Sequence, residues 1–449
     1  MRLDFDEWNI HVGPDHPFNR RAAPIDNGTA RPAPDRYTSP AFARAEWERV
    51  FARSWLLAGP AADIPEPGDF MRFDIGGESF LIVRGEEGQI HAHYNVCPHR
   101  GSRLVTEDFG SVAQFSCPFH SWKFALDGRC AAVTDAATFR PEVLAHGTQL
   151  SSVRCEVAVG LVFIAMDPAI RPLAEWLAPI LPQLALYDID RMYVIQHRQS
   201  AWGANWKGGV DAFAEIYHLH AVHPQTQGLM DDRTQIDLWP GGLSRQFVPF
   251  AQPSPRYADQ EGVNPGIQLM LRDAGIDPAA YTGTARETRA AVQAAKRRRS
   301  AELGLGYEKF SDSQLSDSVV YSLFPNVQIG CHPEAVFLHR FLPHASDPAR
   351  FTYDTCILYR HIDAPGYSAP AWMGLGDEVD FSGRTRPAIT RTGPGEPPGL
   401  GEVLDQDSDL LPVVQQGAGS RGFRGPLWSE QEGRLRHFHA ELDRMMAAG

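Results

Sequence analysis

Short apolar runs separated by turn residues characterise the chain between about residues 45 and 168. Four runs have the length of β-strands: 80–83, 90–96, 122–126 and 161–165. The segment 85–88, bounded by glycines, separates the first two runs, and Asp127-Gly128 after the third is a typical hairpin turn. A short helical stretch begins near Glu46. The pattern predicts a small antiparallel β domain over residues 45–168.

Helix-like and strand-like segments are mixed in the rest of the chain. Helices are predicted near 173–186 and 210–222, and strands at 335–341 and 352–358. This mixture predicts a larger α+β domain over residues 169–449, built on an antiparallel sheet.

Four further segments have local signals of their own. Residues 1–44 lack sustained apolar periodicity, so we expect an irregular arm that packs on the larger domain. Residues 287–303 predict a polar helix, and the strongest basic run of the chain, 296–299, is expected to be a solvated face; whether it has a docking role is left open. The Gly/Pro-rich stretch 392–401 predicts a loop. Ser429 and Glu432 have the spacing of a capping box that opens a final helix.

Composition and charge exclude several classes of protein. The 449 residues are 43% hydrophobic and 22% charged, which is typical of a folded protein with two domains. The net charge of -13 opposes a nucleic-acid partner. The longest apolar stretch, 157–166, is too short to cross a membrane, and the acidic start of the chain does not resemble a signal peptide. We therefore expect a cytoplasmic protein.

Two cysteine-histidine pairs carry the most specific chemical signal. Cys97 and His99 form a C-x-H pair, and Cys117 and His120 form a C-x-x-H pair after 17 intervening residues. Each pair follows a strand-like run, so two hairpin tips could surround one metal centre. A zinc finger places both cysteines in one half, whereas each half here supplies one cysteine and one histidine. This order favours a Rieske [2Fe-2S] cluster over structural zinc.

The remaining cysteines have no paired ligand spacing, and we interpret them as packing residues. They are Cys130, Cys155, Cys331 and Cys356.

A second group of metal-binding side chains lies in the middle of the chain. Asp211, Glu215 and His218 are separated by four and three residues, so on one helix beginning after Gly208-Gly209 they would share a face. Pro224 should end that helix and let His223 converge with His218. Two histidines and one carboxylate form the facial triad typical of non-haem Fe(II) oxygenases.

These segments resemble the catalytic α subunit of the Rieske non-haem iron ring-hydroxylating oxygenases. The resemblance rests on C-x-H-R-G at 97–101, C-P-x-H-x-W at 117–122 and N-W-K at 205–207, followed by acids and Y-H-x4-H at 217–223. It extends from about residue 45 to the C-terminus.

The resemblance also implies roles for individual residues. The third iron ligand should precede the V-Q-x-G segment 414–417; Asp407 matches best, and Asp405 and Asp409 compete with it. Glu215 matches an acid that joins a cluster histidine, here His120, to His218 of a neighbouring subunit. Asp211 and Glu215 are thus expected to be catalytic. The family positions that border the iron and the substrate are Asp211, Ala212, Ile216 and Leu219.

By resemblance the chain is the terminal oxygenase of a multicomponent system. It would use O2 and electrons from NAD(P)H, delivered by a ferredoxin and/or a flavin reductase, because no dinucleotide fingerprint is evident in the sequence. A head-to-tail homotrimer is implied, possibly with a separate β subunit.

The reaction itself has three interpretations. The main expectation is hydroxylation, specifically cis-dihydroxylation, of an aromatic or related apolar ring compound in aromatic hydrocarbon catabolism. The alternative is a monooxygenase or oxidative demethylase that acts on an aromatic acid or an amine-type substrate. It is considered because family members that act on quaternary amines also have a glutamate at the position of Glu215. A Rieske electron carrier without oxygenase activity is the third possibility.

Overall fold

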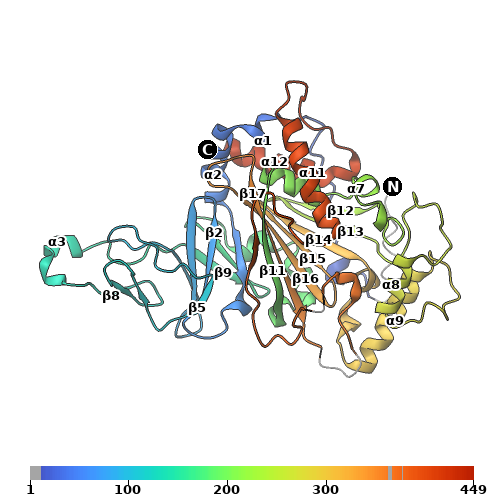
Figure 1. Ribbon diagram of the computed structural model, residues 1–449, viewed down its shortest axis with the longest axis horizontal. Coiled ribbons are helices and arrows are strands. Elements are labelled where there is room, and N and C mark those ends of the chain that lie inside the picture. The colour runs from blue at the N-terminus through green and yellow to red at the C-terminus, as the bar shows by residue number, and fades with distance from the viewer. Residues whose placement is uncertain (1–11, 363–366, 377, 449) are drawn as a thin grey trace.

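The computed structural model describes residues 12–362, 367–376 and 378–448. Figure 1 shows an elongated molecule with a narrow β-rich part at one end and a broad sheet covered by helices at the other. The acidic start of the chain, on which the expectation about a signal peptide rests, lies outside the described residues. Within those residues, no helix combines the length and the apolar character that crossing a bilayer requires.

The narrow part consists of three small antiparallel sheets, with strand orders β4-β3-β2-β5, β6-β7-β8 and β1-β10-β9. The strands are β1 (Leu56–Pro60), β2 (Asp69–Ile75), β3 (Glu78–Arg84), β4 (Ile90–Tyr94), β5 (Phe109–Ser111), β6 (Phe115–Ser116), β7 (Lys123–Phe124), β8 (Cys130–Ala132), β9 (Arg154–Ala158) and β10 (Leu161–Ala165). The predicted hairpin at Asp127-Gly128 joins β7 to β8. The predicted antiparallel β fold of this part is confirmed.

The broad part is an eight-stranded sheet in the described chain, in the order β12-β13-β14-β15-β16-β17-β11-β18. Its strands are β11 (Met192–Trp202), β12 (Gln235–Trp239), β13 (Leu243–Val248), β14 (Ser318–Leu323), β15 (Val327–Cys331), β16 (Ala335–Pro343), β17 (Phe351–Arg360) and β18 (Thr390–Thr392). Neighbours pair antiparallel except β18, which pairs parallel with β11. The sheet is therefore mixed at one edge, and Thr392 belongs to a strand where the sequence predicted the start of a loop.

Most helices lie around this sheet or in the N-terminal region, and the short helix at 141–144 lies in the narrow part (Figure 1). The helices are α1 (Asp35–Thr38), α2 (Pro40–Arg49), α3 (Pro141–Leu144), α4 (Leu173–Leu177), α5 (Leu181–Leu184), α6 (Trp206–Phe213), α7 (Leu219–Val222), α8 (Pro265–Asp273), α9 (Thr288–Leu303), α10 (Asp312–Ser316), α11 (Glu402–Ala418) and α12 (Gly433–Ala447). The fold class is α+β, as predicted. Nothing in this arrangement tests the predicted domain boundaries at residues 44 and 168.

The two faces of the large sheet have different environments because successive side chains of a strand point to opposite sides. One face carries Phe247, Tyr321 and Leu338 into an apolar core that includes α4 and α5. The other face is more polar and is covered by α6, α11 and α12, which lie together beside it in Figure 1. On this face Gln328 of β15 donates a hydrogen bond to the carbonyl of Val210 in α6. The side chains that are candidates for catalysis lie on this polar face.

In these parts of the chain, two local predictions about helices are wrong, and a third is confirmed only in part. The segment 173–186 forms two short helices, because Pro179 and Pro182 lack the amide proton that a continuous helix needs. The helix predicted near Glu46 already begins at Pro40, where the Ser39 hydroxyl accepts a hydrogen bond from the amide of Phe42. At the C-terminus, the predicted capping box of Ser429 and Glu432 is present, but it caps a short 3-10 turn that precedes α12.

The basic run on α9 is mostly folded into the protein and is not a solvated face. Lys296 is buried and lies 2.8 Å from Glu334, and Arg297 lies 2.6 Å from Asp312. The Arg299 guanidinium stands over the Tyr367 ring. Arg298 is the exposed member of the run. Acidic side chains from distant segments pair with these basic residues and allow them to pack inside the protein. The local sequence does not contain these partners, so it does not predict the pairing.

The segment Asn205-Trp206-Lys207 attaches α6 to the N-terminal helix α2. The Asn205 side chain caps α6 by accepting a hydrogen bond from the Lys207 amide at 3.0 Å. The Lys207 ammonium is fully buried and donates to both carboxylate oxygens of Glu46, at 2.8 and 3.0 Å. The Trp206 indole donates to the same carboxylate at 2.9 Å. Burial lowers the pKa of Lys207, and the adjacent Glu46 charge opposes that shift.

We expect Glu46→Ala to destabilise the larger domain by about 3–5 kcal/mol, because it leaves the Lys207 ammonium buried without a counter-charge. Calorimetric unfolding of the purified protein measures the effect. Glu48→Gln, on the exposed side of the same helix, should change stability by less than about 0.5 kcal/mol. A Glu46→Ala variant as stable as the parent would show that the ion pair contributes nothing to this joint.

Candidate metal centres

The two cysteine-histidine pairs lie on matched loops in the narrow part of the molecule. In each loop the residue four positions after the cysteine donates its amide to the cysteine carbonyl: Gly101 to Cys97 at 3.0 Å and Ser121 to Cys117 at 2.9 Å. Both residues have positive φ, +75° and +56°. Gly101 adopts this conformation without steric cost, whereas Ser121 is held in it by the turn. The two halves therefore have the same backbone shape despite different spacing.

The side chains of these loops converge on one space. The His99 and His120 rings are 4.6 Å apart, and the Cys97 and Cys117 thiols hydrogen-bond to each other. The Nδ1 atoms of both histidines are buried and have no hydrogen-bond partner among the described residues. Unpartnered buried nitrogens are costly unless something binds them. Two thiols with two open imidazole nitrogens match the donor set of a Rieske [2Fe-2S] cluster.

The surroundings of the loops hold these side chains and leave one side near solvent. Trp122 stacks on His99, with ring centroids 4.8 Å apart and nearly parallel planes. The backbone amides of His99 and Arg100 hydrogen-bond to the Cys97 sulfur. Phe119, next to His120, is 54% exposed. The histidine side of the site is thus open to a partner surface.

The second group of side chains also converges. The Nε2 atoms of His218 and His223 lie 3.2 Å apart, and Asp407 Oδ1 lies 3.1 Å from His223 Nε2 and 3.7 Å from His218 Nε2. All three ligating atoms are within 4.8 Å of one another. His223 and Asp407 are buried, and His218 is partly exposed. Two imidazoles and one carboxylate in this arrangement fit a facial-triad iron.

Neighbouring side chains leave the Nε2 atoms free for a metal. Glu215 Oε1 lies 2.5 Å from His218 Nδ1, and Gln406 Oε1 lies 2.7 Å from His223 Nδ1. An acceptor at Nδ1 places the ring proton there and the lone pair on Nε2. Burial lowers the pKa of His218, but the hydrogen bond and charge of Glu215, with the charge of Asp407, outweigh it and raise the pKa.

The sequence predicted a single helix over 210–222 for this group, and that prediction is wrong. α6 ends at Phe213 and α7 begins at Leu219, with an irregular turn between them. In that turn the Glu215 carboxylate accepts hydrogen bonds from the amides of Tyr217 and His218, which competes with helical hydrogen bonding. His223 departs from helical geometry just before Pro224, as the sequence predicts.

Because of this break, Asp211 does not share a helical face with Glu215 and His218. Both Asp211 oxygens accept hydrogen bonds from elsewhere, from the Tyr37 hydroxyl at 2.7 Å and from His439 Nε2 at 3.0 Å. Tyr37 and His439 were not identified from the sequence, because one lies in the N-terminal arm and the other in the last helix. A catalytic role for Asp211 stays a prediction, and its contacts link it to these two helices.

The other predicted positions differ in how the structure places them. Of the three competing acids, Asp407 reaches the histidines; Asp409 is exposed, and Asp405 accepts a hydrogen bond from the Leu400 amide. Residues two positions apart on α11 point to different sides, which separates the candidates. Ala212 and Ile216 are partly buried and Leu219 is buried, and their assignment to a substrate pocket stays a prediction.

Sequence patterns did not predict a group of aromatic side chains that lies beside the triad. Phe213, two residues before Glu215, lies 5.2 Å from the Tyr353 ring and 5.5 Å from the His339 ring. Phe337 stacks on His339 at 6.5 Å. Phe213 places this group next to the triad, because Glu215, two residues further on, contacts His218. Burial raises the pKa of Tyr353, and the charge of Asp407 adds to the shift. We call Phe213, Phe337 and Tyr353 the aromatic wall.

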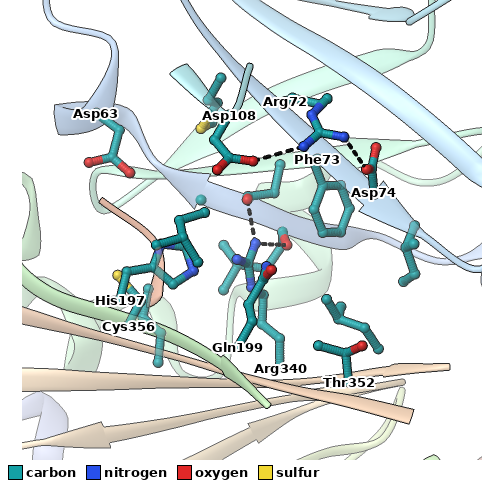
Figure 2. A pocket seen from close by; sticks show the side chains of 18 of the residues that line it. Asp63, Arg72, Phe73, Asp74, Asp108, His197, Gln199, Arg340, Thr352 and Cys356 are labelled. Carbon is teal, nitrogen blue, oxygen red and sulfur yellow. Dashed lines mark hydrogen bonds and ion pairs between the residues drawn. The ribbon is translucent and has the colours of Figure 1, made fainter. Parts of the chain in front are cut away.

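A separate cavity of about 320 Å³ lies on the opposite face of the sheet, between β2 and β5 on one side and β11, β16 and β17 on the other. Figure 2 shows Arg340 and His197 reaching into it from the sheet, with Arg72 held between Asp74 and Asp108. Arg340 and His197 both pair with Asp354. Because these side chains already pair with one another, we interpret the cavity as a joint between the two parts of the molecule.

Comparisons with known proteins agree with both halves of this description. A family model described as Rieske [2Fe-2S] domain matches residues 54–149. A second, described as ring hydroxylating alpha subunit (catalytic domain), matches residues 189–448, more than half of the chain.

Curated relatives and solved structures extend the comparison. The glycine betaine monooxygenase oxygenase subunit of Chromohalobacter salexigens is 34% identical over 189 residues, 42% of each chain. The carnitine monooxygenase oxygenase subunit of Escherichia coli (strain K12) is 32% identical over 227 residues, 49% of this chain and 58% of the relative. The chain thus matches about half the length of these relatives.

Two solved structures share the fold. A quaternary ammonium Rieske monooxygenase in complex with L-carnitine has a TM-score of 0.65 at 18% identity, covering 95% of this chain and 99% of that one. Naphthalene 1,2-dioxygenase from Rhodococcus sp. has a TM-score of 0.63 at 18% identity, covering 93% and 94%. At this sequence identity, the two structures show a shared fold and do not indicate the substrate.

Proposed function

The chain belongs to the ring-hydroxylating oxygenase α subunits that carry a Rieske domain, and from this we propose that it is the oxygenase component of a monooxygenase for quaternary ammonium compounds. The convergence of His218, His223 and Asp407 carries the proposal of oxygenase chemistry. The monooxygenase names of the relatives support the amine-type alternative better than the main expectation, cis-dihydroxylation of an aromatic ring. An electron carrier would have no use for the triad.

Each proposed cofactor has a defined set of side chains. Cys97 and Cys117 would hold one iron of the [2Fe-2S] cluster, and the Nδ1 atoms of His99 and His120 the other. His218, His223 and Asp407 would hold the mononuclear iron, which when bound keeps coordination positions open for oxygen. Glu215 and Gln406 orient the two histidine rings through their Nδ1 atoms.

The aromatic wall supports a cationic substrate. Aromatic faces attract ammonium groups, with the strongest effect where water is excluded. Phe213 and Phe337 keep partial exposure, whereas Tyr353 is fully buried and packs behind them. The triad carboxylate adds negative charge nearby. In the proposed reaction one oxygen atom of O2 enters a C–H bond of the substrate and the other leaves as water. The two electrons come from NAD(P)H through a separate reductase, with or without a ferredoxin, and two protons come from solvent.

Electron delivery supports a head-to-tail homotrimer. The cysteine-histidine loops lie toward the end of the molecule marked by β8 and α3 in Figure 1, far from α7 and α11, which carry the triad. Exposed apolar side chains occur at both places: Phe119 beside the loops, and Tyr217 with Val413 and Val414 near the triad. We expect the loops of one subunit to dock on the triad region of the next. A separate β subunit stays an open expectation.

Product analysis tests the proposed function. Purified enzyme with a reductase and NADH should consume O2 with glycine betaine or L-carnitine and release an amine that has lost a methyl group or the carbon chain. Naphthalene should give no diol. Diol formation from naphthalene, without turnover of any ammonium compound, would restore the main expectation.

We also predict that the purified protein contains a Rieske centre, because the two loops supply two thiols and two open imidazole nitrogens. It should contain acid-labile sulfide and give the rhombic EPR signal of a reduced Rieske cluster. Cys97→Ser should lose both features, whereas Cys130→Ser should keep them. A colourless protein that holds stoichiometric zinc after anaerobic preparation contradicts this assignment.

A further inference from the structure

His339 stands in the middle of the aromatic wall and has no role in the proposed metal sites. It lies on β16, on the polar face of the sheet, between Phe337 and the Tyr353 ring, which stacks on it at 5.9 Å with an interplanar angle of 14°. Phe213 closes a third side at 5.5 Å. The ring keeps partial exposure despite this enclosure. One edge of the imidazole therefore faces open space next to the triad.

Two hydroxyl groups lie next to His339 Nδ1, and from them we assign the tautomer of the ring. Tyr353 Oη lies 2.7 Å and Thr355 Oγ1 lies 3.4 Å from His339 Nδ1, and the Thr355 hydroxyl also hydrogen-bonds to Tyr353. If Thr355 donates to Tyr353 and Tyr353 donates to Nδ1, every hydroxyl proton in the chain has an acceptor. Nδ1 is then the acceptor, and the ring proton lies on Nε2.

The Nε2 atom is thus an N–H donor held in a fixed direction. It has no hydrogen-bond partner in the described part of the chain, although the ring is packed on three sides. Burial lowers the pKa of His339 to about 4, so the ring is neutral at physiological pH and does not repel a cation. A neutral donor beside an aromatic surface suits a molecule with an ammonium group at one end and an anionic oxygen at the other.

We propose that His339 is a specificity-determining residue whose Nε2–H donates a hydrogen bond to the carboxylate of a zwitterionic ammonium substrate, while Phe213 and Phe337, the partly exposed members of the aromatic wall, hold the cationic end. This inference rests on the proposed function and narrows it from ammonium compounds in general to those that carry a carboxylate. A substrate without the carboxylate leaves the donor unpaired, which weakens binding.

Binding to the iron-loaded, oxidised protein tests the inference, with calorimetry as the measurement. Glycine betaine and L-carnitine carry a carboxylate, and choline does not. His339→Phe keeps an aromatic ring and removes the donor; we expect it to weaken binding of the two carboxylates about ten- to hundredfold and to leave choline binding unchanged. His339→Gln, whose amide can donate from a similar reach, should recover part of the loss.

His332→Phe is the matched control, since His332 is a second buried histidine close to Phe337, and it should leave all three affinities unchanged. Iron content and the cluster spectrum establish that each variant is folded. Equal weakening of choline and the carboxylates by His339→Phe, or no weakening of either, overturns the role of His339 and leaves the proposed function standing. Wild-type protein that neither binds nor turns over any of the three compounds overturns the proposed function, and this inference with it.

Discussion

Replacing Asp407 with alanine is expected to remove the mononuclear iron and to lower oxygenation by at least about hundredfold, since even residues that only orient metal ligands change activity by 10–100-fold. Asp407 Oδ1 lies within 4 Å of both histidine Nε2 atoms, and two imidazoles alone would leave the metal without an anionic ligand. His218→Ala and His223→Ala should behave in the same way. Iron analysis and O2 consumption measure the two losses.

The cysteine-histidine loops should be unaffected by these changes, because they draw on a different segment of the chain. The visible spectrum of the cluster in Asp407→Ala therefore serves as an internal control for folding. Asp405→Ala and Asp409→Ala are matched controls on the same helix and should keep both iron and activity. If Asp407→Ala kept iron and turnover while Asp405→Ala or Asp409→Ala lost them, the assignment of the third ligand would be wrong.

Replacing Glu215 with glutamine is expected to keep both metal centres and to lower turnover by about 10–100-fold. The carboxylate accepts from His218 Nδ1 and, in the proposed trimer, would accept from His120 of the neighbouring subunit. Gln keeps the size of the side chain, removes the charge and cannot accept equally from two imidazoles. The cluster should still be reduced normally, while transfer of its electron to the iron becomes slow.

Single-turnover mixing of the pre-reduced enzyme with O2 and a substrate separates these steps. The rate at which the cluster is reoxidised should fall in Glu215→Gln. Asp409→Asn, which neutralises an exposed acid on α11, should reoxidise like the parent. If the cluster of Glu215→Gln is reoxidised as fast as in the parent, the carboxylate does not connect two subunits. Its role would then be to orient His218 within its own chain.

Local patterns predicted the parts of the candidate sites that lie close together in sequence. The two cysteine-histidine pairs were recognised because each needs only one turn of backbone, and His223 because Pro224 ends the helix beside it. The antiparallel β fold of the narrow part and the α+β class follow from strand length and turn residues, and both are confirmed. Asp407 is 184 positions from His223, so resemblance to a family, and no local pattern, selected it.

Other features depend on contacts that no local pattern contains. The break between α6 and α7 arises because Glu215 bonds to the amides that follow it, while the spacing of Asp211, Glu215 and His218 favours a continuous helix. Lys296 and Arg297 of the basic run on α9 pair with Glu334 and Asp312, which come from other segments. The aromatic wall joins α6 to β16 and β17, so Phe213 lies more than a hundred positions before its other two members.

The attachment of α6 to α2 changes how one part of the family resemblance should be used. Asn205, Trp206 and Lys207 helped to identify the chain, yet their contacts include a helix cap, a bond from the Asn205 amide to Gln415 and a buried ion pair with Glu46, and none of them belongs to the metal-ligating group. A match to this tripeptide therefore diagnoses an architecture and not a reaction. A chain that kept these three residues but lacked the iron ligands would share the architecture without the chemistry, and a search that gave the tripeptide weight would still select it.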